Sequence, residues 1–166
     1  MKAATESFPV RVLEGQGASE RAARALREYY AEIGERLGES FGPDPLENLV
    51  IEEVTPPRGD FLLVTELGTA AILGFGGVHV PRREEEHVVA ELQRMWLVPG
   101  ARGRGLGSFL LRALENRARA LGAHRMQLSL HHSLTEAMAL YESAGYVAVE
   151  EFETKPFVDV YLAKDL

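Results

Sequence analysis

The sequence predicts an α/β (α+β) domain in which helices flank a single sheet. Short apolar runs that end in glycine or proline alternate along the chain with segments whose apolar residues recur every three or four positions. The length of 166 residues suits one hydrophobic core and is short for two. The composition, 46% hydrophobic and 26% charged, is typical of a folded chain and excludes a disordered one. We therefore expect one domain over residues 1–166.

The first sixty residues predict a strand followed by helices. Phe8–Gly15 alternates between apolar and polar residues and ends in glycine, which predicts a strand. A helix follows, with Ser19 as its expected N-cap. Its apolar stripe consists of Ala22, Leu26, Tyr29, Tyr30, Ile33 and Leu37. Ser40–Pro45 breaks this helix with glycine and proline, and a second short helix or loop is expected near Pro45–Val54.

The middle of the chain predicts a hairpin. Phe61–Leu67 and Thr69–Val80 are strand-like runs that turn near Gly68. The glycines at positions 74, 76 and 77 predict a bulge or a close backbone approach in the second run. A charged loop follows, and its Arg83–Glu86 run fits either a solvated loop or the border of a site for a cationic substrate.

Val88–Val98 predicts a strand that ends before a proline. Strict alternation would place one set of side chains on one face of the sheet, namely Leu92, Arg94 and Trp96. It would place the other set on the opposite face, namely Glu91, Gln93, Met95 and Leu97. A helix over Ser108–Leu121 follows, because its apolar residues form one stripe and Gly122 is placed to end it.

The last part of the chain predicts a strand, a helix and two closing strands. His124–His132 is the strand. The helix lies within Ser133–Tyr146, where Ser133 and Glu136 have the spacing of a capping box. The closing strands are Val147–Glu153 and Val158–Leu166.

The corner between the Val88–Val98 strand and the next helix predicts an anion site. Three glycines and two arginines alternate over Arg102–Gly107. A helix start carries unpaired N–H groups and the positive end of the helix dipole, and glycines let a phosphate approach the backbone. A tight turn with solvated arginines is the alternative. A dinucleotide site fits less well, because the glycine spacing differs and the next strand runs into His131 and His132 rather than an acidic residue.

Two motifs together resemble a known family. The segment "ELQRMWLVPGARGRGLGSFLL" contains the R-x-x-G-x-G loop of the GNAT superfamily of acyl-CoA-dependent N-acetyltransferases, and "EAMALYESAGY" is similar to its A-x-x-L-Y-x-x-x-G-[FY] signature. The resemblance covers roughly residues 61–166. It implies the GNAT fold, a mixed and mostly antiparallel central sheet flanked by helices, with a coenzyme A cleft where two central strands splay apart. It also implies acetyl transfer from acetyl-CoA to an amine acceptor.

The resemblance assigns residues to coenzyme A. The residues that it implies at the pyrophosphate, chiefly through backbone N–H groups, are Arg102, Gly103, Arg104, Gly105, Leu106, Gly107 and Ser108. The strand before them would offer its main chain to the pantetheine arm, through Met95, Trp96 and Leu97. The side chains of these three residues are expected in the core, which is compatible with a role for their backbone.

The resemblance also implies an acid and a base. Tyr141 occupies the position of the tyrosine that protonates the leaving thiolate, although its helical spacing alone would fit a core residue. Glu91 is the candidate base, acting through water, and an ordinary surface carboxylate is the equal alternative. Another position where the family carries a base holds Ser129, which has no carboxylate.

One departure from the family pattern keeps other functions open. Many members carry an asparagine that contacts coenzyme A where this chain has Leu134. A non-catalytic acyl-CoA sensor or interaction module on the same fold is therefore an alternative to an enzyme. Transfer of a longer acyl group is another, since cleft depth cannot be read from the sequence.

The composition limits the classes of partner that the chain is expected to bind. The net charge of −7 argues against non-specific nucleic-acid binding, and no apolar run approaches the roughly 20 residues that cross a bilayer. The absence of cysteine excludes thiolate ligands and a cysteine nucleophile, and it fits a cytoplasmic setting. No metal site is expected, because His131 and His132 would face opposite ways on a strand. A homodimer is left open, since dimers are common in the family.

Overall fold

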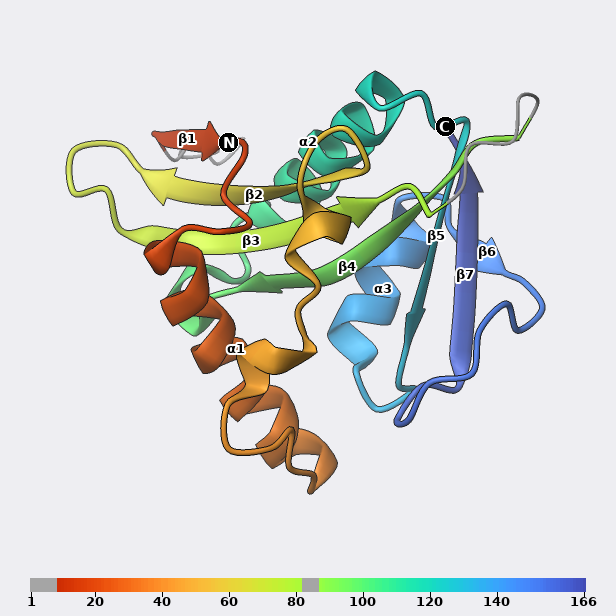
Figure 1. Ribbon diagram of the computed structural model, residues 1–166, viewed down its shortest axis with the longest axis horizontal. Coiled ribbons are helices and arrows are strands. Elements are labelled where there is room, and N and C mark those ends of the chain that lie inside the picture. Colours follow the sequence, from red (N-terminus) through yellow and green to blue (C-terminus); the bar gives the residue numbers. More distant parts are fainter. Residues whose placement is uncertain (1–8, 82–86) are drawn as a thin grey trace, which may run out of the picture.

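The computed structural model describes residues 9–81 and 87–166, and over these ranges the chain forms one seven-stranded sheet with helices on both faces (Figure 1). The strands are β1 Val10–Leu13, β2 Gly59–Glu66, β3 Ile72–His79, β4 Val89–Leu97, β5 Arg125–Leu130, β6 Val147–Ala148 and β7 Val160–Asp165. Their order in the sheet is β1-β2-β3-β4-β5-β7-β6. The β4–β5 pair is parallel and the other pairs are antiparallel, which confirms the mixed, mostly antiparallel sheet.

The sheet separates the core into two hydrophobic clusters, and helices cover the one on each face. The α-helices are α1 Glu20–Leu37, α2 Leu106–Ala120 and α3 Thr135–Ser143, and the short 3-10 helices are η1 Pro45–Asn48, η2 Ile51–Val54 and η3 Pro99–Ala101. The α1 cluster includes Leu26, Phe61 and Phe75. The cluster under α2 and α3 includes Leu62 and Leu114. Successive residues of β2 therefore fill different clusters, as the alternation of side chains along a strand requires.

The start of α1 is fixed as predicted. The Ser19 hydroxyl oxygen accepts a hydrogen bond from the N–H of Ala22 at 3.0 Å, which satisfies one of the unpaired donors of the first turn. The expected capping box at α3 is wrong. That helix begins at Thr135 without a side-chain cap, because Ser133 bonds His131 and Glu136 bonds Arg36 of α1.

A bulge in β4 overturns the predicted assignment of its faces. Arg94 has φ +51°, and the β3–β4 register skips between Phe75 and Gly77. The extra residue reverses the alternation. Leu92 consequently packs in the α2–α3 cluster while Trp96 packs in the α1 cluster.

The glycines of β3 lie where this bulge and the neighbouring helix approach closely. A Cβ atom on Gly76 would meet Leu114 Cδ1 of α2 at 2.6 Å, and one on Gly74 would meet the Trp96 carbonyl oxygen at 2.7 Å. The β2–β3 register also skips one residue of β3, between Ile72 and Gly74, so a bulge and a close approach in this strand are both confirmed.

The sheet opens between β4 and β5. Their parallel ladder holds Val89 opposite Arg125, Ala90 opposite Met126 and Glu91 opposite Gln127, and within the described chain it ends there. Beyond this point the two strands diverge, and α3 lies across the gap (Figure 1). The expected splay of two central strands is confirmed.

The predicted strand Val147–Glu153 is shorter than expected. The ladder with β7 covers the two residues of β6, and one more backbone hydrogen bond, from Val149 N–H to the Tyr161 carbonyl oxygen at 3.0 Å, follows before the chain leaves the sheet edge. Glu153 accepts hydrogen bonds from the Ser129 hydroxyl at 2.6 Å and, at its carbonyl, from the Tyr161 hydroxyl at 2.8 Å. These side-chain contacts replace the backbone ladder. None of the helices in the described ranges is long and apolar enough to cross a membrane.

Candidate functional site

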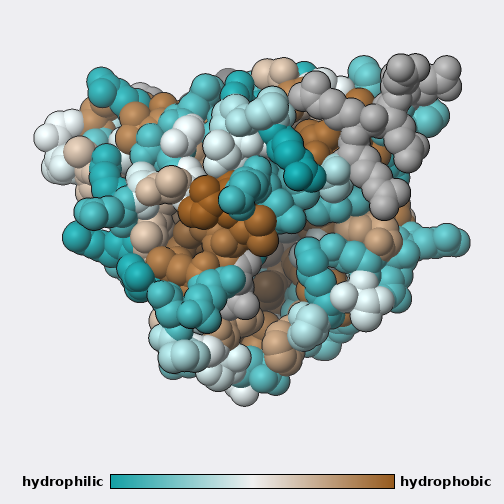
Figure 2. Space-filling model, viewed as in Figure 1, coloured by the Kyte–Doolittle hydropathy of each residue, from teal (hydrophilic) through white to brown (hydrophobic). Residues whose placement is uncertain are grey.

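A cavity of about 640 Å³ lies where β4 and β5 diverge. It is lined from both sides of the sheet: by α1, by the glycine corner after β4, by α3 and by residues 156–158 before β7. Figure 2 shows the face that carries α1 hollowed near its centre, with apolar surface beside the hollow. The opening predicted between the strands is thus a real space, continuous from the glycine corner to α1.

The glycine corner has the geometry of an anion site. Gly103 and Gly105 have φ +76° and +82°, in the left-handed region that favours glycine. Gly105 is the N-cap of α2 and offers no side chain to the first turn. The N–H groups of the first turn, from Leu106 to Ser108, have no partner within the helix and are directed at its N-terminal end. The corner lines the cavity, so these donors are available to a ligand there.

The first arginine of the corner, Arg102, is held by α1. Arg102 Nη2 lies 2.8 Å from both carboxylate oxygens of Glu32 and 2.9 Å from the Leu97 carbonyl oxygen. Trp96 Nε1 donates to the same carboxylate at 2.6 Å. Burial raises the pKa of Glu32, but the hydrogen bonds from Arg102 and Trp96 outweigh it and lower that pKa below its usual range. The Arg102 charge is therefore neutralised within the protein.

The three residues assigned to the pantetheine arm lie along the opening. Met95 and Leu97 line the cavity and pack against the α2–α3 cluster, while Trp96 is 7% exposed and packs under α1. The Leu97 carbonyl already accepts hydrogen bonds from Arg102. Contacts from a bound ligand to this strand are accordingly left to its remaining main-chain groups.

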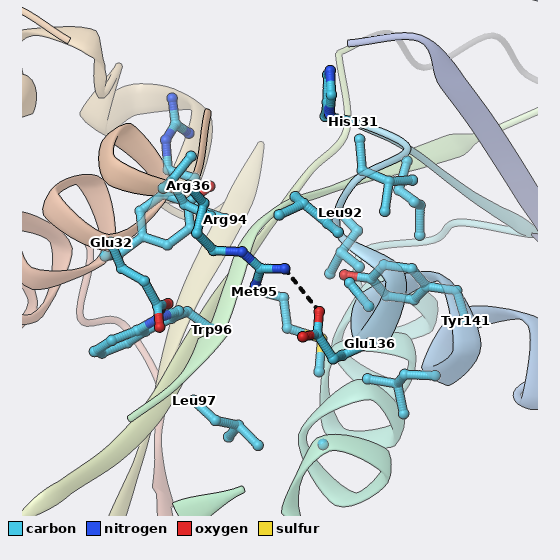
Figure 3. Close-up of a pocket in the computed structure, with 18 of the residues that line it drawn as sticks. Glu32, Arg36, Leu92, Arg94, Met95, Trp96, Leu97, His131, Glu136 and Tyr141 are labelled. Carbon is cyan, nitrogen blue, oxygen red and sulfur yellow. Dashed lines mark hydrogen bonds and ion pairs between the residues drawn. The ribbon is translucent and has the colours of Figure 1, made fainter. Parts of the chain in front are cut away.

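Tyr141 projects into the cavity from α3 (Figure 3). It is 7% exposed, and its ring lies edge-on to Tyr146 with centroids 5.8 Å apart. Burial raises the pKa of the Tyr141 phenol above its usual value, so the hydroxyl stays protonated at neutral pH. Leu134, at the place of the usual asparagine, also lines the cavity and offers it only an apolar side chain.

Glu91 directly precedes Leu92, which lines the cavity, but is not itself one of the described lining residues. Its carboxylate is half-buried and accepts a hydrogen bond from Gln127 Nε2 at 3.3 Å. Burial, and then the nearby Glu153 carboxylate, raise the pKa of Glu91. Ser129, which does line the cavity, is bonded to Glu153. Glu91 can therefore reach the cavity only through an intervening group or a water.

A bridge across the cavity was not predicted. Arg36 near the end of α1 lies 2.9 Å from the Glu136 carboxylate on α3, and this ion pair joins the two sides of the cleft (Figure 3). The only sequence signal was the four-residue spacing that puts Glu32 and Arg36 on one side of α1. Their partners, far away in the chain, could not be read from that spacing.

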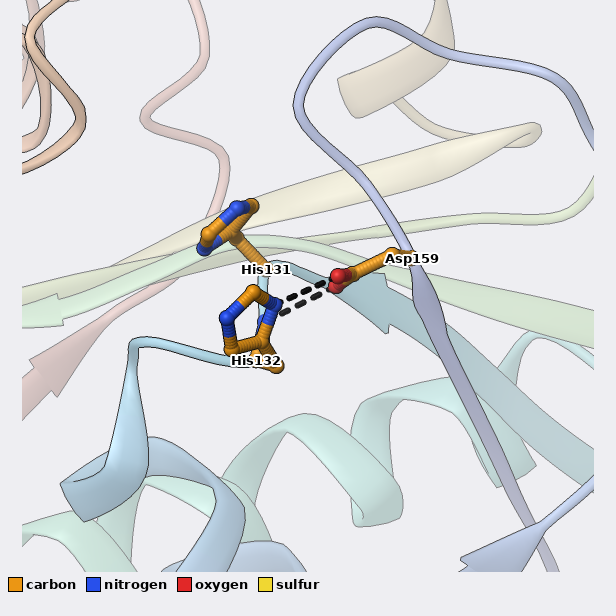
Figure 4. A group of neighbouring side chains, drawn as sticks. All are labelled: His131, His132 and Asp159. Carbon is orange, nitrogen blue, oxygen red and sulfur yellow. Dashed lines mark hydrogen bonds and ion pairs between the residues drawn. The ribbon is translucent and has the colours of Figure 1, made fainter.

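The prediction that His131 and His132 face opposite ways is wrong. Strand β5 ends at Leu130 and the chain turns, so the alternation of a strand no longer applies. The two imidazole rings stack with centroids 4.3 Å apart, and His132 Nδ1 lies 2.5 Å from an Asp159 carboxylate oxygen (Figure 4).

These three residues offer ligand atoms within 4.8 Å of one another, the separation that a metal site requires. However, the rings lie only 31° from parallel, so their in-plane lone pairs do not converge on one point. Each imidazole also has a protein partner already, Ser133 for His131 and Asp159 for His132. Hydrogen bonding within the protein accounts for this cluster.

The charged run Arg83–Glu86 lies outside the described residues. The site assembled from the described part of the chain consists of the glycine corner, the β4 edge, Tyr141 and the α1 side of the cavity.

Comparison with known proteins matches this arrangement to one family. The family model described as the Acetyltransferase (GNAT) family matches residues 20–146. The chain is 30% identical over 129 residues to the uncharacterized N-acetyltransferase YjgM of Escherichia coli, covering 77% of this chain and 75% of that protein. It is 27% identical over 122 residues to the IAA acetyltransferase of Azospirillum brasilense, covering 74% and 76%.

Solved structures share the fold. An acetyltransferase of the GNAT family from Staphylococcus aureus superposes with a TM-score of 0.73 at 15% identity, covering 94% of this chain and 98% of that one. A phosphinothricin acetyltransferase from Sinorhizobium meliloti, solved in complex with AcCoA, superposes with a TM-score of 0.70 at 20% identity, covering 96% and 89%. The chain belongs to the GNAT family of N-acetyltransferases, a family that uses acetyl-CoA.

Proposed function

We propose that this N-acetyltransferase moves the acetyl group to a primary amine of a small molecule or peptide, by direct attack within a ternary complex. The observation that carries the proposal is the single cavity that joins the glycine corner and Tyr141 to the α1 side of the sheet. Two substrates can enter such a cavity from opposite sides and meet at the opening between β4 and β5. The absence of cysteine from the chain leaves no thiol to carry the acetyl group between them.

Acetyl-CoA is assigned to the α2–α3 side. Its pyrophosphate would accept hydrogen bonds from the N–H groups of the first turn of α2, from Leu106 to Ser108, at the positive end of the α2 dipole. Its pantetheine arm would run along the Met95–Leu97 edge of β4. Because Glu32 neutralises Arg102, most of the attraction for the phosphates would come from backbone donors rather than from that side chain.

The chemical step needs one base and one acid. The amine arrives largely as ammonium and must lose a proton before its nitrogen attacks the thioester carbonyl. Glu91 accepts that proton in this proposal, because burial raises its proton affinity. The proton passes through water, because Glu91 does not line the cavity. The new C–N bond forms, the C–S bond breaks, and the Tyr141 hydroxyl gives its proton to the departing thiolate. The attacking nitrogen then loses its second proton, which through water restores the Tyr141 phenol and leaves the neutral amide.

Replacing Tyr141 by phenylalanine tests this assignment. The variant keeps the buried ring and loses only the acid, so we expect turnover to fall by about 10²–10⁴-fold with little change in stability. Tyr161→Phe is the matched control, because it removes a hydroxyl that bonds the Glu153 carbonyl outside the cavity lining. The rate of thiol release from acetyl-CoA measures the turnover of both variants. Unchanged turnover in the Tyr141 variant would remove the assigned acid.

A second candidate function is an acyl-CoA sensor without chemistry on the same fold. Two observations favour it: Leu134 replaces a polar contact to coenzyme A, and Glu91 is set back from the cavity. The two functions separate in one experiment, because a sensor would bind acetyl-CoA without releasing thiol in the presence of any of a broad panel of amines.

A further inference from the structure

The α1 side of the cavity presents an apolar wall. We call it the acceptor wall, and it consists of Tyr29, Ile33, Leu37, Phe41, Phe157 and Val158. The first three are spaced four residues apart on α1 and therefore share one face of that helix. Phe41 follows the helix, and the last two residues come from the segment before β7. Two distant parts of the chain thus combine to present apolar surface to the cavity.

Phe157 carries the strongest sign that this wall is built for a ligand. It has φ +62°, a left-handed conformation that is costly for a bulky residue. It is nevertheless 40% exposed, and its ring lies edge-on to Phe41 with centroids 6.2 Å apart. A strained and exposed aromatic side chain at a cavity is typical of a binding surface rather than of a core.

The charges that line the cavity do not suit a polycation. Within the described part of the chain, the lining carboxylates are Glu32 and Glu136, and each is ion-paired, with Arg102 and Arg36 respectively. Three arginines line the cavity, namely these two and Arg94. A second ammonium group on the acceptor would have to displace an arginine from its carboxylate or lie against apolar side chains. Both alternatives cost free energy.

We infer that the acceptor is a monoamine on an apolar body: a primary amine attached to an alkyl or aryl group, with no second cationic group. This inference rests on the proposed function and specifies its substrate. The apolar body packs against the acceptor wall while the amine reaches the opening between the strands. Polyamines and aminoglycosides, which the acidic composition alone would allow, are poor acceptors for this cavity.

Hexylamine and 1,5-diaminopentane test the inference, because they have the same number of non-hydrogen atoms and differ only in one terminal group. Thiol release should give hexylamine a kcat/KM at least about tenfold higher, although the diamine offers two equivalent nucleophiles. Calorimetric titration into protein saturated with coenzyme A should show the same preference in binding. A diamine that binds as tightly as hexylamine, or absent binding of both, would overturn the inference.

The two readouts separate this inference from the proposed function. Preferential binding of hexylamine without thiol release would support the acceptor chemistry and contradict acetyl transfer to amines. Thiol release at equal rates with both amines would support acetyl transfer and contradict the inference.

Variants of the acceptor wall provide an independent test. Ile33→Glu places a carboxylate on the wall and should raise the diamine-to-hexylamine ratio of kcat/KM about tenfold. Ala31→Glu, at an exposed position of α1 outside the cavity lining, should leave the ratio unchanged. Phe157→Ala should weaken hexylamine binding more than diamine binding, and Phe152→Ala, on an aromatic residue of the same segment that is not in the lining, is its control. Equal ratios in wall variants and controls would contradict the assigned wall.

Discussion

Replacing Gly105 by alanine perturbs the glycine corner at one point. Gly105 is the N-cap of α2 with φ +82°, and a Cβ atom placed on it would meet nothing within 4 Å. The substitution therefore introduces no clash, and its whole effect comes from the backbone conformation. Gly100→Ala is the matched control, because a Cβ atom there also lies in open space but the backbone has no positive φ.

The expected magnitude follows from two opposing terms. An L-residue in the left-handed region costs about 1–2 kcal/mol. Alanine also restricts the unfolded chain, which returns about 0.4–1 kcal/mol at a compatible site. The Gly105 variant should therefore lose about 1 kcal/mol of unfolding free energy, whereas the Gly100 variant should lose none and gain up to about 1 kcal/mol.

Thermal and denaturant unfolding measure the unfolding free energy of both variants. For a chain of this size, 1 kcal/mol corresponds to roughly 2–4 °C in Tm. If the corner holds the pyrophosphate, the Gly105 variant should also bind acetyl-CoA less tightly, because relief of strain would turn the N–H groups away from the ligand. Equal stabilities and equal affinities in the two variants would refute this explanation of the corner.

Three further predictions concern the proposed base Glu91 and the histidine pair. The pKa of Glu91 is raised, so kcat/KM should fall as pH drops through that raised pKa, and Glu91→Gln should be slow and lack this acidic limb. The same raised pKa means that ionisation of Glu91 destabilises the folded wild-type protein. The unfolding free energy of Glu91→Gln minus that of wild type should therefore rise as pH increases from the ordinary carboxyl pKa through the raised one. A difference that falls with pH would contradict this. Chelation with EDTA should leave turnover unchanged, since the stacked rings of His131 and His132 do not converge on an ion, and loss of activity that zinc restores would show the opposite.

Local patterns were sufficient to predict most of the fold. Ser19 as a cap, the stripe of α1 and the strand-to-helix corner at Gly105 all depend on neighbouring residues, and all are present. The assignment of faces in β4 failed because the Arg94 bulge adds one residue against β3. The glycines of β3 indicated the bulge in β3 itself, but not the second bulge in the partner strand β4.

The predictions for the site failed where a side chain is bound by a distant partner. Glu136 was assigned to a helix cap and instead pairs with Arg36, one hundred residues away in the chain. Glu32, which neutralises Arg102, had no signal in the sequence beyond its place on α1. Motifs indicate which backbone we assign to the cofactor, whereas the acceptor wall depends on long-range packing that no single stretch encodes.

Thermal unfolding with and without acetyl-CoA tests the central claim most directly, with NAD and ATP as controls. A ligand at about 100 times its Kd stabilises the folded state by roughly 2.7 kcal/mol, a shift on the order of 5–10 °C for a chain of this size. We predict that shift with acetyl-CoA, a smaller one in the Gly105→Ala variant at the same concentration, and none with NAD. No shift with acetyl-CoA, or a larger one with NAD, would contradict the assignment of the cavity to acetyl-CoA.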